Sequence, residues 1–251
     1  MTTPDEFIHA VREHLFVRGY DCSNPYMLHY HANCERAQFG VWPEVTHFVD
    51  QCIHEHRIAY QPERNGKRPS SNAGASERWL AVHEAGHAVV GIRTGLTMYG
   101  IRFYGDGGPP GEAGFEEFAW HVSTNENHLR RVICVDVAAN LAEMLLGVRE
   151  PDGGLPSQFW DKHDRMSDCD CPSDIRDAWL CSRRLAIIQF KLVNRQLEDG
   201  ELFRTRRAIV EQAEAEANQI LYENRDVLNN LADRLKLGPL TGAQVRAVVG
   251  V

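Results

Sequence analysis

Two histidines and a glutamate stand at a spacing that could support metal-dependent hydrolysis. The stretch His83-Glu84-Ala85-Gly86-His87 has the pattern His-Glu-x-x-His inside an apolar run. Residues four apart lie one turn above each other on a helix, so His83 and His87 could give two imidazole nitrogens to one Zn²⁺. Glu84 follows the first of them and could act as general base toward a water on that ion.

The motif alone is weak evidence, because the chain has 12 histidines and short motifs arise by chance. The alternative is an amphipathic helix that carries two surface histidines. The flanking residues Leu80, Val82, Val89 and Val90 oppose it, since a buried His or Glu is costly without a partner. Gly86 also costs about 1 kcal/mol relative to Ala inside a helix. Close approach of a neighbouring element would explain that glycine.

A zinc site that leaves one position open needs a third protein ligand. Glu143 falls on a predicted buried helix, where it could bind the metal or accept a hydrogen bond from an imidazole. Asp174 stands at the start of another predicted helix, whose dipole stabilises a carboxylate. Position alone does not choose among the candidates, which are His121, Glu143, His163 and the aspartates between Asp161 and Asp177.

The elements that would position these residues are mostly helical. Residues 61–75 hold two Pro, two Gly and no large apolar residue, which predicts a linker between an N-terminal helical extension (1–60) and a main domain (76–251). We predict a mainly α (α+β) fold with a small β-hairpin beside the motif helix and a C-terminal helical bundle. Strands are predicted at 97–104 and 114–122, and helices at 5–18, 43–60, 76–95, 174–196, 203–222, 224–236, 242–249 and from the cap Ser123 to Gly147.

Composition narrows the class of protein. With 251 residues, 43% hydrophobic and 25% charged, the chain is an ordinary globular protein, and its net charge of -8 opposes general nucleic-acid binding. Runs of 18 apolar residues and the features of a signal peptide are lacking, which predicts a cytoplasmic protein without direct membrane insertion. We interpret the seven cysteines as free thiols. We interpret His29, His31 and Cys34 as locally packed or surface residues rather than metal ligands. We likewise interpret Cys169 and Cys171 as residues of a plain loop rather than a metal site.

The motif helix, His83-Glu84-Ala85-Gly86-His87-Ala88-Val89, resembles the zinc helix of the FtsH-type peptidase domain, the protease half of the membrane-bound AAA proteases. The resemblance covers about residues 77–250. Segment 173–178, Ser-Asp-Ile-Arg-Asp-Ala, is similar to the family's Asn-Asp-Ile-x-x-Ala-Thr, whose Asp is the third zinc ligand. Further similar stretches follow the family order at 101–104, 137–147, 215–228 and 240–242.

The resemblance implies a zincin-like zinc endopeptidase. It assigns His83, His87 and Asp174 as Zn²⁺ ligands, Glu84 as the catalytic base, and Glu143 as a supporting carboxylate that does not bind the metal. The chain departs from the family at Asn140-Leu141, at Trp179 and in a larger loop at 148–172, and it has no Gly-x-x-x-x-Gly-Lys-[Ser/Thr] nucleotide-binding motif.

We therefore expect an ATP-independent peptidase that cuts peptides or unfolded and exposed protein segments, which would pair with the strand at 115–120. A separate ATPase or adaptor could feed it. Alternatives are a zinc-binding regulatory module without turnover and a hydrolase of another amide. The substrate, the oligomeric state and the role of residues 1–60 stay open.

Overall fold

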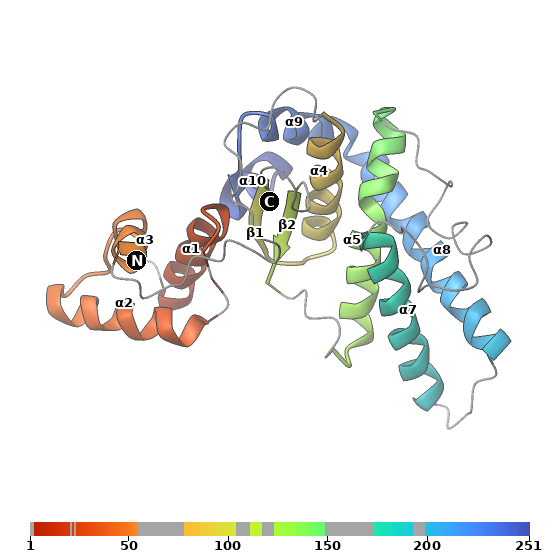
Figure 1. Ribbon diagram of the computed structural model, residues 1–251, viewed down its shortest axis with the longest axis horizontal. Helices are drawn as coiled ribbons and strands as arrows, with labels where there is room; N and C mark the ends of the chain where they lie inside the picture. Colours follow the sequence, from red (N-terminus) through yellow and green to blue (C-terminus); the bar gives the residue numbers. More distant parts are fainter. Residues whose placement is uncertain are drawn as a thin grey trace.

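The computed structural model describes residues 3–20, 22, 24–54, 78–103, 111–116, 123–148, 173–192 and 199–251. These residues form nine helices and one three-stranded antiparallel sheet. This architecture confirms the predicted mainly helical class with a small sheet (Figure 1). The predicted linker lies outside the described residues, as does the predicted loop at 148–172 beyond its first residue, and the domain division stays a prediction.

The N-terminal segment folds as three helices, α1 (Pro4–Val17), α2 (Pro25–Phe39) and α3 (Val45–His54). A capping box between Thr3 and Glu6 begins α1. Helix α2 was not predicted from the sequence, although Asn24 caps it and Gly40 ends it in the left-handed conformation. The exposed side chains of Tyr26 and Tyr30 interrupt the apolar periodicity of α2, so the sequence pattern did not indicate a helix.

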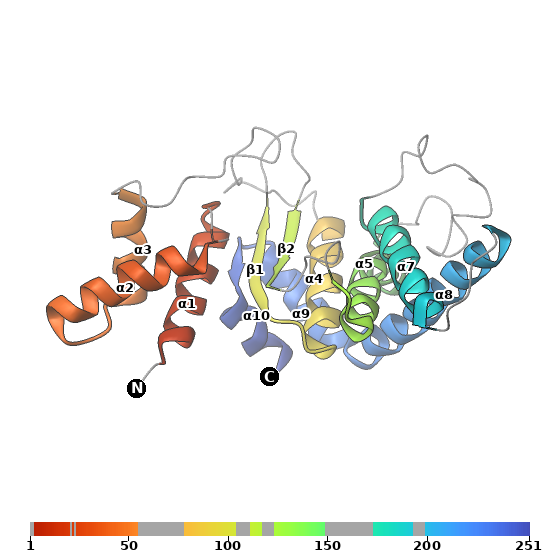
Figure 2. The same ribbon diagram turned by 90° about the horizontal axis from the view of Figure 1, so that it is seen from below.

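The sheet lies between α1 and the motif helix α4 (Arg78–Arg93) (Figure 2). Its strands are β1 (Met98–Phe103), β2 (Gly111–Phe115) and β3 (Leu240–Thr241), in the order β2-β1-β3. The second strand was expected at 114–122, but it begins at Gly111, and 117–122 lie outside the described residues. Two glycines in β2 lower its strand propensity, and this misled the prediction.

Alternate residues of β2 face the two helices that enclose the sheet. A Cβ atom on Gly111 would meet the Glu84 side chain of α4, and Phe115 packs against Gly91 of the same helix. A Cβ atom on Gly114 would instead meet the Phe16 ring of α1. Strand β2 therefore runs along α4 on one face and supports α1 on the other, as the two-residue period of a strand requires.

Five further helices of the described residues complete the fold. They are α5 (Glu126–Leu146), α7 (Ser173–Leu192), α8 (Asp199–Glu223), α9 (Arg225–Leu235) and α10 (Gly242–Val249). Three predicted helix starts were wrong: Asn125 rather than Ser123 caps α5, α8 begins at Asp199 rather than 203, and α3 begins at Val45 rather than 43. Helix α10 spans the predicted residues, and Thr241 caps it through a capping box.

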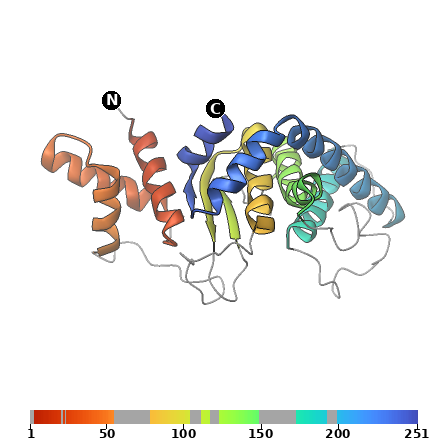
Figure 3. The ribbon, with the colours of Figure 1, turned by 90° about the horizontal axis from the view of Figure 1, so that it is seen from above.

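The buried apolar side chains form two clusters. The larger one joins α4, α5, the sheet and the C-terminal helices, and the smaller one joins α1, α2 and α3. Helix α1 belongs to the small cluster and also covers the sheet, and it lies beside α10 (Figure 3). Among the described helices, we find none with the length and apolar character needed to span a membrane.

Candidate metal centre

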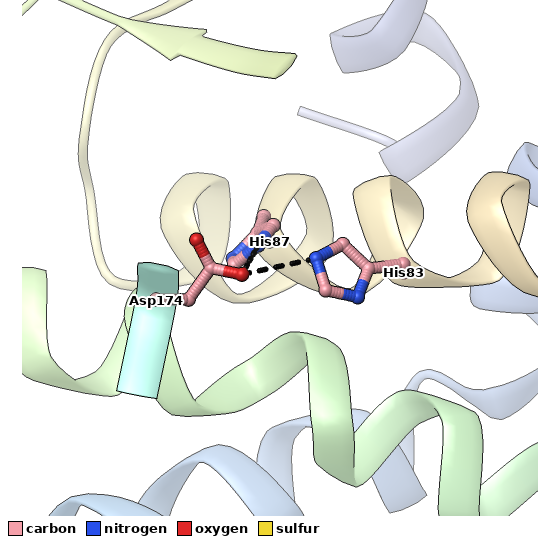
Figure 4. A group of neighbouring side chains, drawn as sticks. All are labelled: His83, His87 and Asp174. Atoms are coloured by element: carbon pink, nitrogen blue, oxygen red, sulfur yellow. Dashed lines mark hydrogen bonds and ion pairs between the residues drawn. The ribbon is translucent and has the colours of Figure 1, made fainter. Parts of the chain in front are cut away.

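Close packing of α4 on α5 places the two motif histidines. A Cβ atom on Gly86 would stand 2.7 Å from Ala142 Cβ and 3.0 Å from the Ala138 carbonyl oxygen, so only glycine allows this approach. The close neighbour inferred for Gly86 is thereby confirmed as α5. His83 and His87 precede and follow Gly86 on α4, and both side chains lie beside Asp174 at the start of α7 (Figure 4).

Asp174, in the first turn of α7, brings a carboxylate to both imidazoles. Its Oδ2 atom lies 3.1 Å from His83 Nε2 and 3.6 Å from His87 Nε2. One donor atom from each of the three residues lies within 4.8 Å of the other two. Zinc–ligand bonds of 2.0–2.2 Å at tetrahedral angles separate donor atoms by about 3.4 Å. The separations of Asp174 Oδ2 from the two Nε2 atoms bracket that value, so this group could hold a divalent metal ion.

The outer nitrogen of each imidazole also has a partner, and both partners belong to α5. His87 Nδ1 lies 2.7 Å from the Val135 carbonyl oxygen, and His83 Nδ1 lies 2.7 Å from Glu143 Oε1. A carbonyl oxygen only accepts, so Nδ1 of His87 donates its proton and the neutral ring has its lone pair on Nε2. The Glu143 carboxylate favours the same tautomer for His83. Histidine ligands of metals are usually oriented in this way.

The protein groups also shift the protonation equilibria of the site. Burial alone would lower the pKa of His83, but hydrogen bonds to Asp174 and Glu143 outweigh it and raise that pKa to about 10. Burial would raise the pKa of Asp174, yet hydrogen bonds from His83 and His87 hold it well below its usual range. Asp174 is therefore an anion at neutral pH, as a metal ligand must be. A divalent cation among the three donors would favour the neutral imidazole, since binding needs the nitrogen lone pair.

Glu84 lies against the first residue of β2. It is 4% exposed, and its carboxyl group stands close enough to Gly111 that a Cβ there would meet Oε1 at 2.6 Å. Burial raises the pKa of Glu84, which the charges of His83 and His87 partly offset. A carboxylate whose pKa is raised is a stronger proton acceptor than a fully solvated one, which suits a general base.

The structure thus brings together His83, His87 and Asp174, with Glu84 and Glu143 beside them. The alternative ligands His121 and His163, and the pair Cys169 and Cys171, lie outside the described residues. The roles of the five site residues stay predictions.

Two groups that line the site were not predicted from the sequence. The Val135 carbonyl is a backbone group that no residue type could reveal, and Gly111 lies outside both predicted strands, 97–104 and 114–122. His29, His31 and Cys34 all lie on α2. Among the described residues, the group of His83, His87 and Asp174 is the only one that could hold a metal ion.

One departure from the family pattern has a packing role. Trp179 is buried, its ring meets Phe203 edge to face, and the Arg206 guanidinium lies 3.8 Å from the ring centroid. This tryptophan joins α7 to α8 and so helps to place the helix that carries Asp174.

A scan of protein-family models found no match to this chain, and a search of curated proteins found no relative. The structure therefore supports a helical protein with a His-His-Asp group that could hold a metal ion, and no family is identified.

Proposed function

We propose that the protein is an ATP-independent zinc metallopeptidase that hydrolyses peptide bonds in peptides or in unfolded and exposed protein segments. One observation carries the proposal: Asp174 Oδ2 lies 3.1 and 3.6 Å from the Nε2 atoms of His83 and His87, close to the spacing of tetrahedral zinc ligands, and a buried glutamate follows the first histidine in sequence. Three protein ligands of this kind, with a fourth position open, are typical of hydrolytic zinc sites.

Each residue has a defined task in this reaction. A bound Zn²⁺ supplies Lewis-acid polarisation of the scissile carbonyl and lowers the pKa of water. Glu84 would take the proton from the attacking water and later give it to the leaving amine. Glu143 and the Val135 carbonyl hold the two imidazole rings in place through their Nδ1 protons.

Strand β2 supports a peptide as the substrate class. Among the described strands it is an edge strand, since the sheet order is β2-β1-β3 and the one strand there that pairs with it is β1. An extended peptide could add to the other side through main-chain hydrogen bonds. Because Gly111 at the start of β2 touches Glu84, such a peptide would pass close to the base. Only extended segments could bind this way, which favours unfolded or exposed chain.

The test compares three variants for zinc content and for cleavage of casein and a peptide library. We expect Glu84→Gln to bind zinc as the wild type does and to lose cleavage by at least a hundredfold, the order expected for general-base catalysis. Asp174→Ala should lose zinc as well as activity. Glu223→Gln, which changes an exposed glutamate at the end of α8, serves as control and should behave as wild type.

Two outcomes would contradict the proposal. If Glu84→Gln still cleaves, Glu84 is not the base. If the zinc-loaded wild type binds peptides and cleaves none of them, the protein is a zinc-binding module without turnover.

A further inference from the structure

Strand β2 is attached to α1 at both of its ends. At its far end, Arg12 Nη1 lies 2.5 Å from Glu116 Oε1. At its beginning, Arg102 of β1 donates from Nε and Nη2 to Glu112 Oε2, at 3.0 and 2.7 Å. Arg102 and Glu112 are directly opposite each other in the β1–β2 register, so this ion pair joins the strands at the first residues of β2.

Arg102 also contacts α1 directly. Its Nη1 donates to the Phe16 carbonyl oxygen at 3.1 Å, and its guanidinium lies 4.2 Å from the centroid of the Phe16 ring. The residue is only 8% exposed, which is uncommon for an arginine and requires that its donors be satisfied. The planar guanidinium can meet the carboxylate, the carbonyl and the ring face at once, as a lysine could not.

The strand position that Arg102 fixes is the one beside the candidate base. Gly111 precedes Glu112, and it is in contact with the Glu84 side chain on the opposite face of the sheet. A continuous set of contacts therefore runs from Phe16 through Arg102 and Glu112 to Gly111 and Glu84. A displacement at the α1 end would move the strand segment that the base packs against.

We propose that Arg102 is a positioning residue for peptide hydrolysis and that α1, through Arg102, braces β2 as the substrate-pairing strand. The inference rests on the proposed peptidase function. The N-terminal segment would then have a role in the reaction. Helix α1 would hold β2 at a fixed distance from α4, so that an extended substrate paired with β2 lies close to Glu84.

The test uses the full-length, zinc-loaded protein with Arg102→Met, Arg102→Lys and Glu112→Gln. We expect kcat/KM for a peptide substrate to fall roughly ten- to a hundredfold in Arg102→Met, chiefly through KM, with zinc content unchanged. Arg102→Lys keeps the charge and should restore part of the loss. Glu112→Gln removes the same ion pair from its half-exposed partner, so it tests the brace even if Arg102→Met fails to fold.

A matched control separates bracing of β2 from loosening of α1 in general. Arg246 also binds one carboxylate and one carbonyl, those of Glu13 and Met98, but it lies on the β3 side of the sheet. Arg246→Gln should lower stability without raising KM. Equal KM changes in Arg246→Gln and Glu112→Gln would overturn the proposal, as would wild-type kinetics in both Glu112→Gln and a folded Arg102→Met.

Hydrogen exchange distinguishes failure of this inference from failure of the proposed function. Amides of residues 111–116 should exchange faster in Glu112→Gln than in the wild type, and should be unchanged in Arg246→Gln. Faster exchange in a protein that cleaves nothing would support the brace and reject the peptidase. Unchanged exchange in an active protein would reject the brace alone.

Discussion

At the scale of residues, one helix sets the orientation of both imidazoles. The acceptors of the two Nδ1 protons, the Val135 carbonyl and the Glu143 carboxylate, both stand on α5. Glu143 is 2% exposed, and its Oε1 lies 2.7 Å from His83 Nδ1. A buried carboxylate in this position raises the electron density of the imidazole ring and strengthens it as a ligand.

We expect Glu143→Gln to weaken zinc binding by about 10- to 100-fold, the usual effect of losing a carboxylate partner of a histidine ligand. Competition titration against a chelator would measure the change. Glu126→Gln alters a glutamate on the same helix that bonds Gln189 instead, and it should leave zinc affinity unchanged. Equal affinities of the wild type and Glu143→Gln would show that Glu143 has no part in holding His83.

The sequence could reveal the chemistry of these residues only in part. His83 and His87 are recognisable because their spacing matches one helical turn, and Glu84 because it directly follows the first of them. Asp174 and Glu143 needed the family resemblance, since several acidic residues and histidines were equally plausible by position. The Val135 carbonyl and the contact of Gly111 with Glu84 depend on how α4 meets α5 and β2, which local patterns do not encode.

At the scale of elements, the distance between α4 and α5 decides whether the site can form. Gly86 allows the two helices to touch at Ala138, Ala139 and Ala142, between the two histidine anchors. The apolar periodicity predicted both helices. The close contact between them was indicated only by Gly86, which stands at a position where a helix favours alanine.

We expect Gly86→Ala to lower the free energy of unfolding by about 1–3 kcal/mol, the usual cost of overpacking a tight contact. It should also weaken zinc binding, because forcing α4 from α5 lengthens both Nδ1 hydrogen bonds. Urea denaturation and zinc titration would measure the two effects. Gly200→Ala is the control, since a Cβ there would meet only Arg204 Nη1 at 3.8 Å. If both alanine variants unfold alike, the contact is not as tight as the structure shows.

At the scale of the whole molecule, a buried carboxylate ties the first helix to the last. Glu13 of α1 is 2% exposed and accepts hydrogen bonds from Ala243 N at 3.0 Å and from Arg246 Nη2 at 2.7 Å. Burial alone would raise the pKa of Glu13, but hydrogen bonds from His9, Ala243 and Arg246 outweigh it and lower the pKa. No sequence pattern predicted this link, because its partners are 233 residues apart.

This pKa shift makes the link dependent on pH. Because the folded state lowers the pKa of Glu13 below 4.5, the stabilisation is fully present above pH 4.5 and is lost as the pH falls through the folded pKa. We expect Glu13→Gln to reduce the free energy of unfolding at pH 7 by about 1–3 kcal/mol. The difference from wild type should shrink below pH 4.5.

Denaturant unfolding at pH 7 and at several pH values below 4.5 would measure this difference. Glu211→Gln, which removes an exposed pair with Arg207, should change stability little at any pH. A Glu13→Gln effect that is equal at all pH values would show that the charge of Glu13 is not what holds α1 to α10.

The position of Asp174 has a consequence for the topology of the chain. A metal ion held by His87 and Asp174 would join two points that are 87 residues apart in sequence (174 − 87). It would act as a removable cross-link, closing a large loop that includes β1, β2 and α5. Such a link restricts the unfolded chain more than the folded one, as a disulfide does. Adding a chelator would then destabilise this protein in the way that a reducing agent destabilises a secreted one.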